Sequence, residues 1–192
     1  MTDGKRNILF LGRLEKRKGL PFLLQAYSML KLQMPDIRLI VVGGDGGLRE
    51  VCERYVHKEK LADVIFAGYV SDADKPRYFK TADVYCAPNT GAESLGIVLL
   101  EAMAAGTPTV ASNIEGFADV LTHEQEGLLA PPRNAEALAA ALHRLLADDA
   151  AREEMGKQAG RTAQRYSWDR MAGLVLDYYE ETMATRMNGG SR

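Results

Sequence analysis

Short apolar segments alternate with longer segments of helical spacing along most of this chain, and this alternation constrains its fold more than any other feature. The apolar segments are residues 7–11, 38–42, 64–67, 84–87, 109–111 and 127–129. Helical spacing covers residues 20–32, 48–60, 74–81, 97–105, 117–121, 135–147, 149–164 and 168–187. The pattern predicts an α/β fold, a Rossmann-like, doubly wound parallel sheet of about six strands, with helices on both faces and a helical C-terminus.

The length of the chain bounds its domain organisation. A chain of 192 residues with 46% hydrophobic content buries one good core. We therefore expect a single domain over residues 1–187, followed by a disordered tail over residues 188–192. In parallel sheets of this kind, ligands bind beyond the carboxyl ends of the strands, so the loops that follow the strands are the places to search for a site.

Charge and cysteine content exclude several classes of function. The net charge is −2 and no strongly basic block occurs, which argues against nucleic acid as a partner. Cys52 and Cys86 lack the spacing of a metal site or a disulfide, so we expect buried thiols in a reducing cytoplasm. No apolar run reaches the length of a membrane span and no signal peptide is visible, which predicts a soluble cytoplasmic protein.

Residues 87–108 join a short strand, a glycine-bearing loop and a helix. Glu93 lies in the loop, and Glu101 lies about one turn inside the helix. Between them, the free backbone N–H groups of the helix N-terminus and the positive end of its dipole predict an anion site. A phosphate bound there would have a carboxylate on each side that accepts hydrogen bonds from hydroxyl groups. A nucleotide sugar has this layout, because its diphosphate joins a ribose to a hexose.

The loop after the first predicted strand holds four cations within six residues, Arg13, Lys16, Arg17 and Lys18. Like charges that crowd together oppose folding unless an anion relieves their repulsion. The loop lacks the Gly-Lys-Ser/Thr sequence of a Walker loop. The cluster therefore points to a second phosphate-binding element.

The string from Glu93 to Pro108, Glu-Ser-Leu-Gly-Ile-Val-Leu-Leu-Glu-Ala-Met-Ala-Ala-Gly-Thr-Pro, resembles the donor site of the family 4 retaining glycosyltransferases, which have the GT-B fold. The loop Gly12-Arg13 to Lys18-Gly19 resembles the same family. The residues that follow the third strand and the string Ala82 to Pro88 are most like those of the phosphatidylinositol mannosyltransferases. The resemblance covers residues 7–180, including Tyr166-Ser-Trp-Asp.

The resemblance implies a role for each matching residue. Arg13 and Lys18 would hold the diphosphate and Glu93 would orient the hexose, so these are the candidate catalytic residues. Glu101 would bind the ribose. The remaining candidate donor-binding residues are Gly12, Val70, Lys75, Ser94, Leu95, Gly96, Ile97 and Val98, of which Val70 and Lys75 would face the nucleobase. The implied donor is a GDP- or UDP-hexose of the mannose or glucose type, and no metal or other cofactor is required.

A complete GT-B enzyme has two domains, and this chain resembles only the C-terminal, donor-binding half. The acceptor-binding N-terminal domain would be a missing partner, and any peripheral membrane contact would belong to it. We therefore expect this chain alone to be inactive. The last helix has apolar residues near one side, including Met171, Val175 and Tyr178, and we expect part of that surface to be exposed.

Three alternatives remain at this stage: a nucleotide-sugar epimerase of the same fold, a non-catalytic subunit that binds sugar nucleotides, and a flavodoxin-like signalling domain. The last would need an acidic cluster where the basic loop stands. The segment Gly43-Gly-Asp-Gly-Gly lacks the spacing of a dinucleotide-binding loop and is interpreted as a structural turn. His57, His123 and His143 are interpreted as surface or capping residues.

Overall fold

Six parallel strands form the centre of the structure, which is a computed structural model and describes residues 3–189. The strands are β1 (Arg6–Leu11), β2 (Ile37–Val42), β3 (Val64–Gly68), β4 (Val84–Ala87), β5 (Thr109–Ser112) and β6 (Gly127–Ala130). Their order across the sheet is β3-β2-β1-β4-β5-β6, and every pair is parallel. The predicted class and strand number are confirmed.

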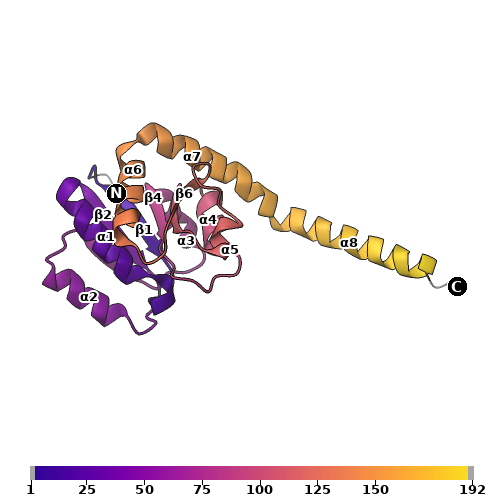
Figure 1. Cartoon of the computed structure of the whole chain (residues 1–192), viewed down its shortest axis with the longest axis horizontal. Helices are drawn as coiled ribbons and strands as arrows, with labels where there is room; N and C mark the ends of the chain where they lie inside the picture. The colour runs from indigo at the N-terminus through magenta and orange to yellow at the C-terminus, as the bar shows by residue number, and fades with distance from the viewer. Residues whose placement is uncertain (1–2, 190–192) are drawn as a thin grey trace.

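Helices cover both faces of this sheet. They are α1 (Leu20–Gln33), α2 (Arg49–Lys58), α3 (Lys75–Thr81), α4 (Ile97–Ala104), α5 (Glu115–Ala118), α6 (Ala135–Ala147), α7 (Asp149–Ala163) and α8 (Trp168–Gly189), with short 3-10 helices η1 (Lys16–Lys18) and η2 (Gln164–Tyr166). The buried side chains of α1, α2 and α6 form one core cluster with the sheet, and those of α3, α4 and α5 form a second; α7 contributes Met155 to the first and Ala159 to the second. The fold is therefore the predicted three-layer arrangement (Figure 1).

Burial on both faces explains why the strands are continuous apolar runs. In β1, Ile8 and Phe10 belong to one core cluster, whereas Leu9 belongs to the other. Successive side chains of a strand point to opposite faces, so each face needs its own apolar residues. The two cysteines serve the same purpose as free, buried thiols, as predicted. Burial raises the pKa of Cys52 to about 11 and raises that of Cys86 further.

The sheet reverses its winding direction between β1 and β4, which are neighbours. From β1 the chain adds β2 and β3 on one side, and from β4 it adds β5 and β6 on the other. The loops after β1 and β4 consequently leave the carboxyl edge of the sheet side by side and diverge. A crevice at such a switch point is the general location of ligand sites in doubly wound sheets.

The glycine-rich turn at residues 43–47 supports the loop after β1. The backbone N–H of Leu14 donates to the carbonyl of Gly44 (3.0 Å), and the N–H of Leu48 donates to the carbonyl of Leu14 (3.1 Å). The Asp45 carboxylate accepts the backbone N–H of Gly47 (2.8 Å) and that of Arg49 in the first turn of α2 (3.2 Å), and these hydrogen bonds lower its pKa. The turn is therefore structural, as the sequence predicts.

Helix α5 differs from its predicted bounds of 117–121 and begins two residues earlier. The carbonyl of Ile114 accepts the N–H groups of Phe117 and Ala118, so the helical turn starts at Ile114. The chain then leaves the helix before Thr122, whose N–H donates to the Glu126 carboxylate (2.9 Å). The apolar spacing of residues 117 and 121 reflects burial in the core and not the limits of the helix.

Helix α8 extends away from the rest of the domain (Figure 1). Its large apolar side chains are exposed: Trp168, Met171, Leu174, Val175, Leu176, Tyr178, Tyr179 and Met183. The expected exposed surface of the last helix is therefore present, with Trp168 at 89% exposure. The helix backbone continues through the first two residues of the predicted disordered tail, and residues 190–192 lie outside the described residues.

Candidate functional site

The loop after β1 brings its last cation back toward the start of the loop. The 3-10 helix η1 ends at Gly19, and this turn places the Lys18 side chain beside Gly12, where a Cβ atom would lie 3.7 Å from Lys18 Cδ. Arg13 is exposed and, within residues 3–189, its side chain forms no hydrogen bond or ion pair. One cation of the loop is thus largely buried between the loops, and another is available to an incoming anion.

The loop after β4 supplies the partner of Lys18. The Lys18 Nζ atom lies 2.7 Å from Glu93 Oε2, and the Asn89 side-chain amide donates to the same oxygen at 2.8 Å. The Lys18 and Glu93 side chains are 15% and 18% exposed, so the pair is largely shielded from water. The structure therefore joins two predicted catalytic residues that lie 75 positions apart in the sequence.

Arg17 ties the two loops together. Its carbonyl accepts the N–H of Thr90 (2.8 Å), and its guanidinium donates to the carbonyl of Ala92 (3.2 Å) and lies 3.5 Å from Glu93 Oε2. Ala92 has a φ of 55°, a conformation that costs free energy for a residue with a side chain. The contacts from Arg17 help to hold this unfavourable loop conformation, which presents Glu93 to the crevice.

Helix α5 supports the same loop from the other side. A Cβ atom on Gly116 would lie 2.1 Å from the carbonyl oxygen of Glu93, so only glycine allows this approach. The ring of Phe117 packs beside Gly96, where an added Cβ would lie 2.7 Å from the ring. The backbone on both sides of Ser94 is thus fixed by α5, although the Ser94 side chain itself is exposed.

The N-terminus of α4 points its free donors toward this region of the sheet edge. Gly96 is the N-cap residue with a φ of 67°, and no side chain caps the helix. The first backbone bond of the helix joins the Leu99 N–H to the Gly96 carbonyl (2.7 Å), so the N–H groups of Ile97 and Val98 lie before it. Uncapped N–H groups and the helix dipole together favour an anion at this position.

The predicted ribose and nucleobase residues lie beside α4. Glu101 is partly buried one turn inside the helix. The hydrogen bond to Asp72 raises the pKa of Lys75, and the charge of Glu101 raises it further. That hydrogen-bonded pair has an N–O distance of 2.7 Å. Val70 packs on the core cluster that contains α4. These residues therefore lie on the same side of the sheet as the α4 N-terminus.

The structure brings together most of the predicted site and adds residues that sequence reasoning missed. Lys18 and Glu93 are in contact, whereas Leu95 and Ile97 are exposed beside them at 42% and 63%. Asn89 was missed, and Arg17 was predicted only as one of the four cations of the basic loop, with no role of its own. The position of Asn89 directly after a buried strand at the switch point was a usable signal, but nothing local marked the contacts that Arg17 makes.

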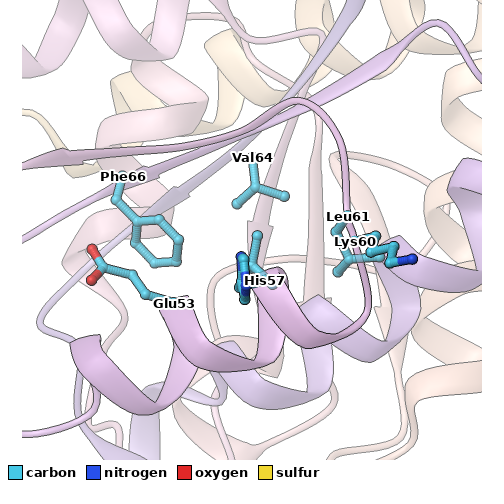
Figure 2. Close-up of a pocket in the computed structure, with 7 residues that line it drawn as sticks. Glu53, His57, Lys60, Leu61, Val64 and Phe66 are labelled. Atoms are coloured by element: carbon cyan, nitrogen blue, oxygen red, sulfur yellow. The ribbon is translucent and has the colours of Figure 1, made fainter.

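The hollows that lie outside the Lys18–Glu93 contact include one at the edge of the sheet and one beside α8. One, of about 430 Å³, lies between α2 and the edge strand β3, with Glu53 and His57 of α2 opposite Val64 and Phe66 of β3 (Figure 2). It is at the outer edge of the sheet and separate from the switch point. The other, of about 1250 Å³, is an apolar groove between α4, α7 and α8, and Glu101 lines it. The candidate site therefore continues into the groove beside α8.

Comparison with known proteins identifies the family. A model described as "Glycosyl transferases group 1" matches residues 2–162. The chain belongs to this family. This group 1 chain is 42% identical over 178 residues to a phosphatidyl-myo-inositol mannosyltransferase from Mycolicibacterium smegmatis, in an alignment that covers 91% of this chain and 45% of that protein. The expected family resemblance is confirmed.

Solved glycosyltransferases share the fold of this group 1 chain. Sucrose-phosphate synthase from Thermosynechococcus elongatus matches with a TM-score of 0.82 and 31% identity, over 95% of this chain and 46% of that one. The C-terminal domain of a glycosyl transferase group 1 protein from Francisella tularensis matches with a TM-score of 0.78 and 22% identity, over 86% and 88%. The chain spans about half the length of the curated relatives it matches.

Proposed function

We propose that this chain is the donor-binding domain of a retaining glycosyltransferase, which transfers a hexose of the mannose or glucose type from a nucleoside-diphosphate sugar to an acceptor. The observation that carries the proposal is the convergence at the β1–β4 switch point. There, Lys18 from one loop contacts Glu93 from the other, directly before the uncapped N-terminus of α4. A cation, a carboxylate and free N–H groups at one crevice match a diphosphate that carries a sugar.

The same groups would assist cleavage of the bond between the anomeric carbon and the leaving phosphate. Negative charge grows on the diphosphate as this bond breaks, and Arg13, Lys18 and the α4 N-terminus supply positive charge and N–H donors at that place. Glu93 would hold hexose hydroxyls and so place the anomeric carbon, while Glu101 would hold the ribose. Because these groups supply the positive charge, we propose that no metal ion is required.

A second domain would complete the enzyme. The acceptor site belongs to that domain in our proposal, because the chain spans about half the length of its curated relatives. Within residues 3–189, no helix is long and apolar enough to cross a membrane. We propose a cytoplasmic location, which agrees with the two free thiols, and assign any membrane contact to the second domain. Assay of the full enzyme with GDP-mannose and UDP-glucose would identify the donor.

Calorimetric titration of this chain with GDP, UDP and ADP tests the proposed binding site. We expect one of the three to bind, and we expect Lys18→Ala and Glu101→Ala each to weaken that binding about tenfold or more, because each removes a hydrogen bond to or from a charged group. Lys60→Ala, in the hollow at β3, is the matched control and should leave the affinity unchanged. Unchanged affinity in both site variants would defeat the assignment.

A further inference from the structure

Three donor groups of different character surround Glu93 Oε2, and two of them, Lys18 and Asn89, form hydrogen bonds to it. Lys18 Nζ lies at 2.7 Å and Asn89 Nδ2 at 2.8 Å, whereas a guanidinium nitrogen of Arg17 lies at 3.5 Å. Two of these donors are cations and one is a neutral amide. The three will therefore respond differently when a strongly anionic group enters the crevice.

A diphosphate competes with Glu93 for the cations. It carries more negative charge than one carboxylate, so the Lys18 ammonium would turn toward it when it binds beside the α4 N-terminus. Arg17 cannot replace Lys18 as a close donor at its present distance, and its side chain is 44% exposed. Binding of the donor thus removes the charged partner of Glu93 at the moment when that carboxylate must hold the hexose.

Asn89 is the donor that this competition affects least. Its residue is 3% exposed and follows β4 and Pro88 directly, so the position of its side chain is set by the core of the sheet. The amide carries no net charge, and a phosphate attracts it less strongly than it attracts an ammonium. A buried amide donor that lost its acceptor would also carry the cost of an unsatisfied polar group. The Asn89–Glu93 bond therefore persists when Lys18 turns away.

We propose that Asn89 is a positioning residue that holds Glu93 toward the hexose after the diphosphate of the donor has drawn Lys18 away. This inference rests on the proposed function. It assigns Asn89 a role in recognising the sugar and none in binding the nucleoside diphosphate. The hexose part of the donor should therefore lose affinity when the amide is removed, and the diphosphate part should not.

Calorimetry with GDP and GDP-mannose, and in parallel with UDP and UDP-glucose, tests this division. For the pair that the wild-type chain binds, Asn89→Ala should lower the affinity for the sugar nucleotide about fivefold. It should change the affinity for the diphosphate by less than about twofold. Thr90→Ala is the matched control, because Thr90 is in the same loop and its hydroxyl bonds to Arg17 and not to Glu93. It should leave the sugar nucleotide affinity unchanged.

A double-mutant cycle separates positioning from a general structural role. In a Glu93→Ala background, the further change Asn89→Ala should have no additional effect on sugar nucleotide affinity, because the side chain that Asn89 positions is gone. Asn89→Asp keeps the size of the side chain but replaces the amide donor by a carboxylate, which repels the carboxylate of Glu93. It should therefore lower the affinity for the sugar nucleotide more than Asn89→Ala does. This isosteric variant serves if the alanine variant fails to fold.

The outcomes distinguish this inference from the proposed function. If the wild-type chain binds none of the four nucleotides, both are overturned. If the wild-type chain binds a pair, but Asn89→Ala lowers its affinities for the diphosphate and for the sugar nucleotide by the same factor, or lowers neither, only the role of Asn89 is overturned. An undiminished effect of Asn89→Ala in the Glu93→Ala background would also overturn it.

Discussion

Charged residues have different roles at the amino edge of the central sheet, where the parallel strands begin, and at its carboxyl edge, where they end. Cations lie at both ends of β1: Lys5 directly before it, Arg6 at its first position, and the loop with Arg13 after it. At the amino edge, Arg6 pairs with Asp83 and Asp149. At the carboxyl edge, Arg13 is exposed and has no such pair within residues 3–189. At the amino edge, ion pairs stabilise the fold. At the carboxyl edge, the Arg13 charge and the free N–H groups of α4 are available to a ligand.

This difference teaches that a charge cluster is informative only together with its position in the sheet. Asp63, directly before β3, takes hydrogen bonds from Lys5 and Lys31, so its charge is satisfied inside the domain. The cluster after β1 stands where the parallel strands end and the sheet reverses its winding. Variants at the two edges should consequently separate into those that change stability and those that change ligand affinity.

The largest effect on stability should come from Arg152→Met. Arg152 is 8% exposed, donates to the carbonyls of Leu145 and Leu146 at the end of α6 and pairs with Asp149. Removing this buried partner should cost about 3 kcal/mol of unfolding free energy. Denaturant unfolding measures the loss, and calorimetry below the unfolding transition should find nucleotide affinity unchanged.

Arg165 provides the control for that variant, because it is exposed and lies in η2, directly after the helix α7 that contains Arg152. Arg165→Met should change the unfolding free energy by less than about 0.5 kcal/mol. If Arg152→Met lowered nucleotide affinity about as strongly as Lys18→Ala, charged residues at the amino edge would not serve stability alone, and the contrast between the two edges would be wrong.

A smaller effect, with a defined pH dependence, should follow from Asp63→Asn. Hydrogen bonds from Lys31 and then Lys5 lower the pKa of the Asp63 carboxyl from 3.8 to about 2. Because the folded-state pKa lies below the unfolded one, the carboxylate contributes stability above pH 4 and loses it as the pH falls toward 2. The variant should lose about 1–2 kcal/mol at pH 7 and progressively less on acidification.

Denaturant unfolding of both proteins between pH 7 and pH 2.5 measures this difference. Asp36→Asn is the control, because Asp36 is an exposed carboxyl at the same edge of the sheet. A difference that stayed constant over this pH range would show that the charge of Asp63 does not cause the stabilisation.

Much of the fold follows from local sequence patterns. Strand β4 and helix α6 have the predicted bounds, because turn residues or an N-cap mark their ends, such as Asn134, which accepts the Ala137 N–H (2.9 Å). The predicted bounds of helix α5 were wrong, because a single helical turn has too few residues to show the period of apolar side chains. In this region the backbone bonds to Ile114 decide the helix start, and apolar spacing does not reveal them.

The candidate site was predictable in its parts and less so in its contacts. The two glutamates and the basic loop are local patterns, and strand order places them at one crevice. The contact between Lys18 and Glu93 depends on the turn that ends at Gly19, and the roles of Arg17 and Asn89 depend on how two loops meet. Such contacts arise between segments far apart in the sequence, where no period or motif records them.

The most direct test of the account is a map of backbone amide shifts by NMR during titration with the nucleoside diphosphate that binds, compared with its nucleoside alone. We predict that the diphosphate shifts the amides of Gly12, Ile97 and Val98, and that the nucleoside leaves these amides largely unchanged. Shifts confined to the hollow between α2 and β3, near His57 and Phe66, would contradict the placement of the diphosphate at the switch point (Figure 2).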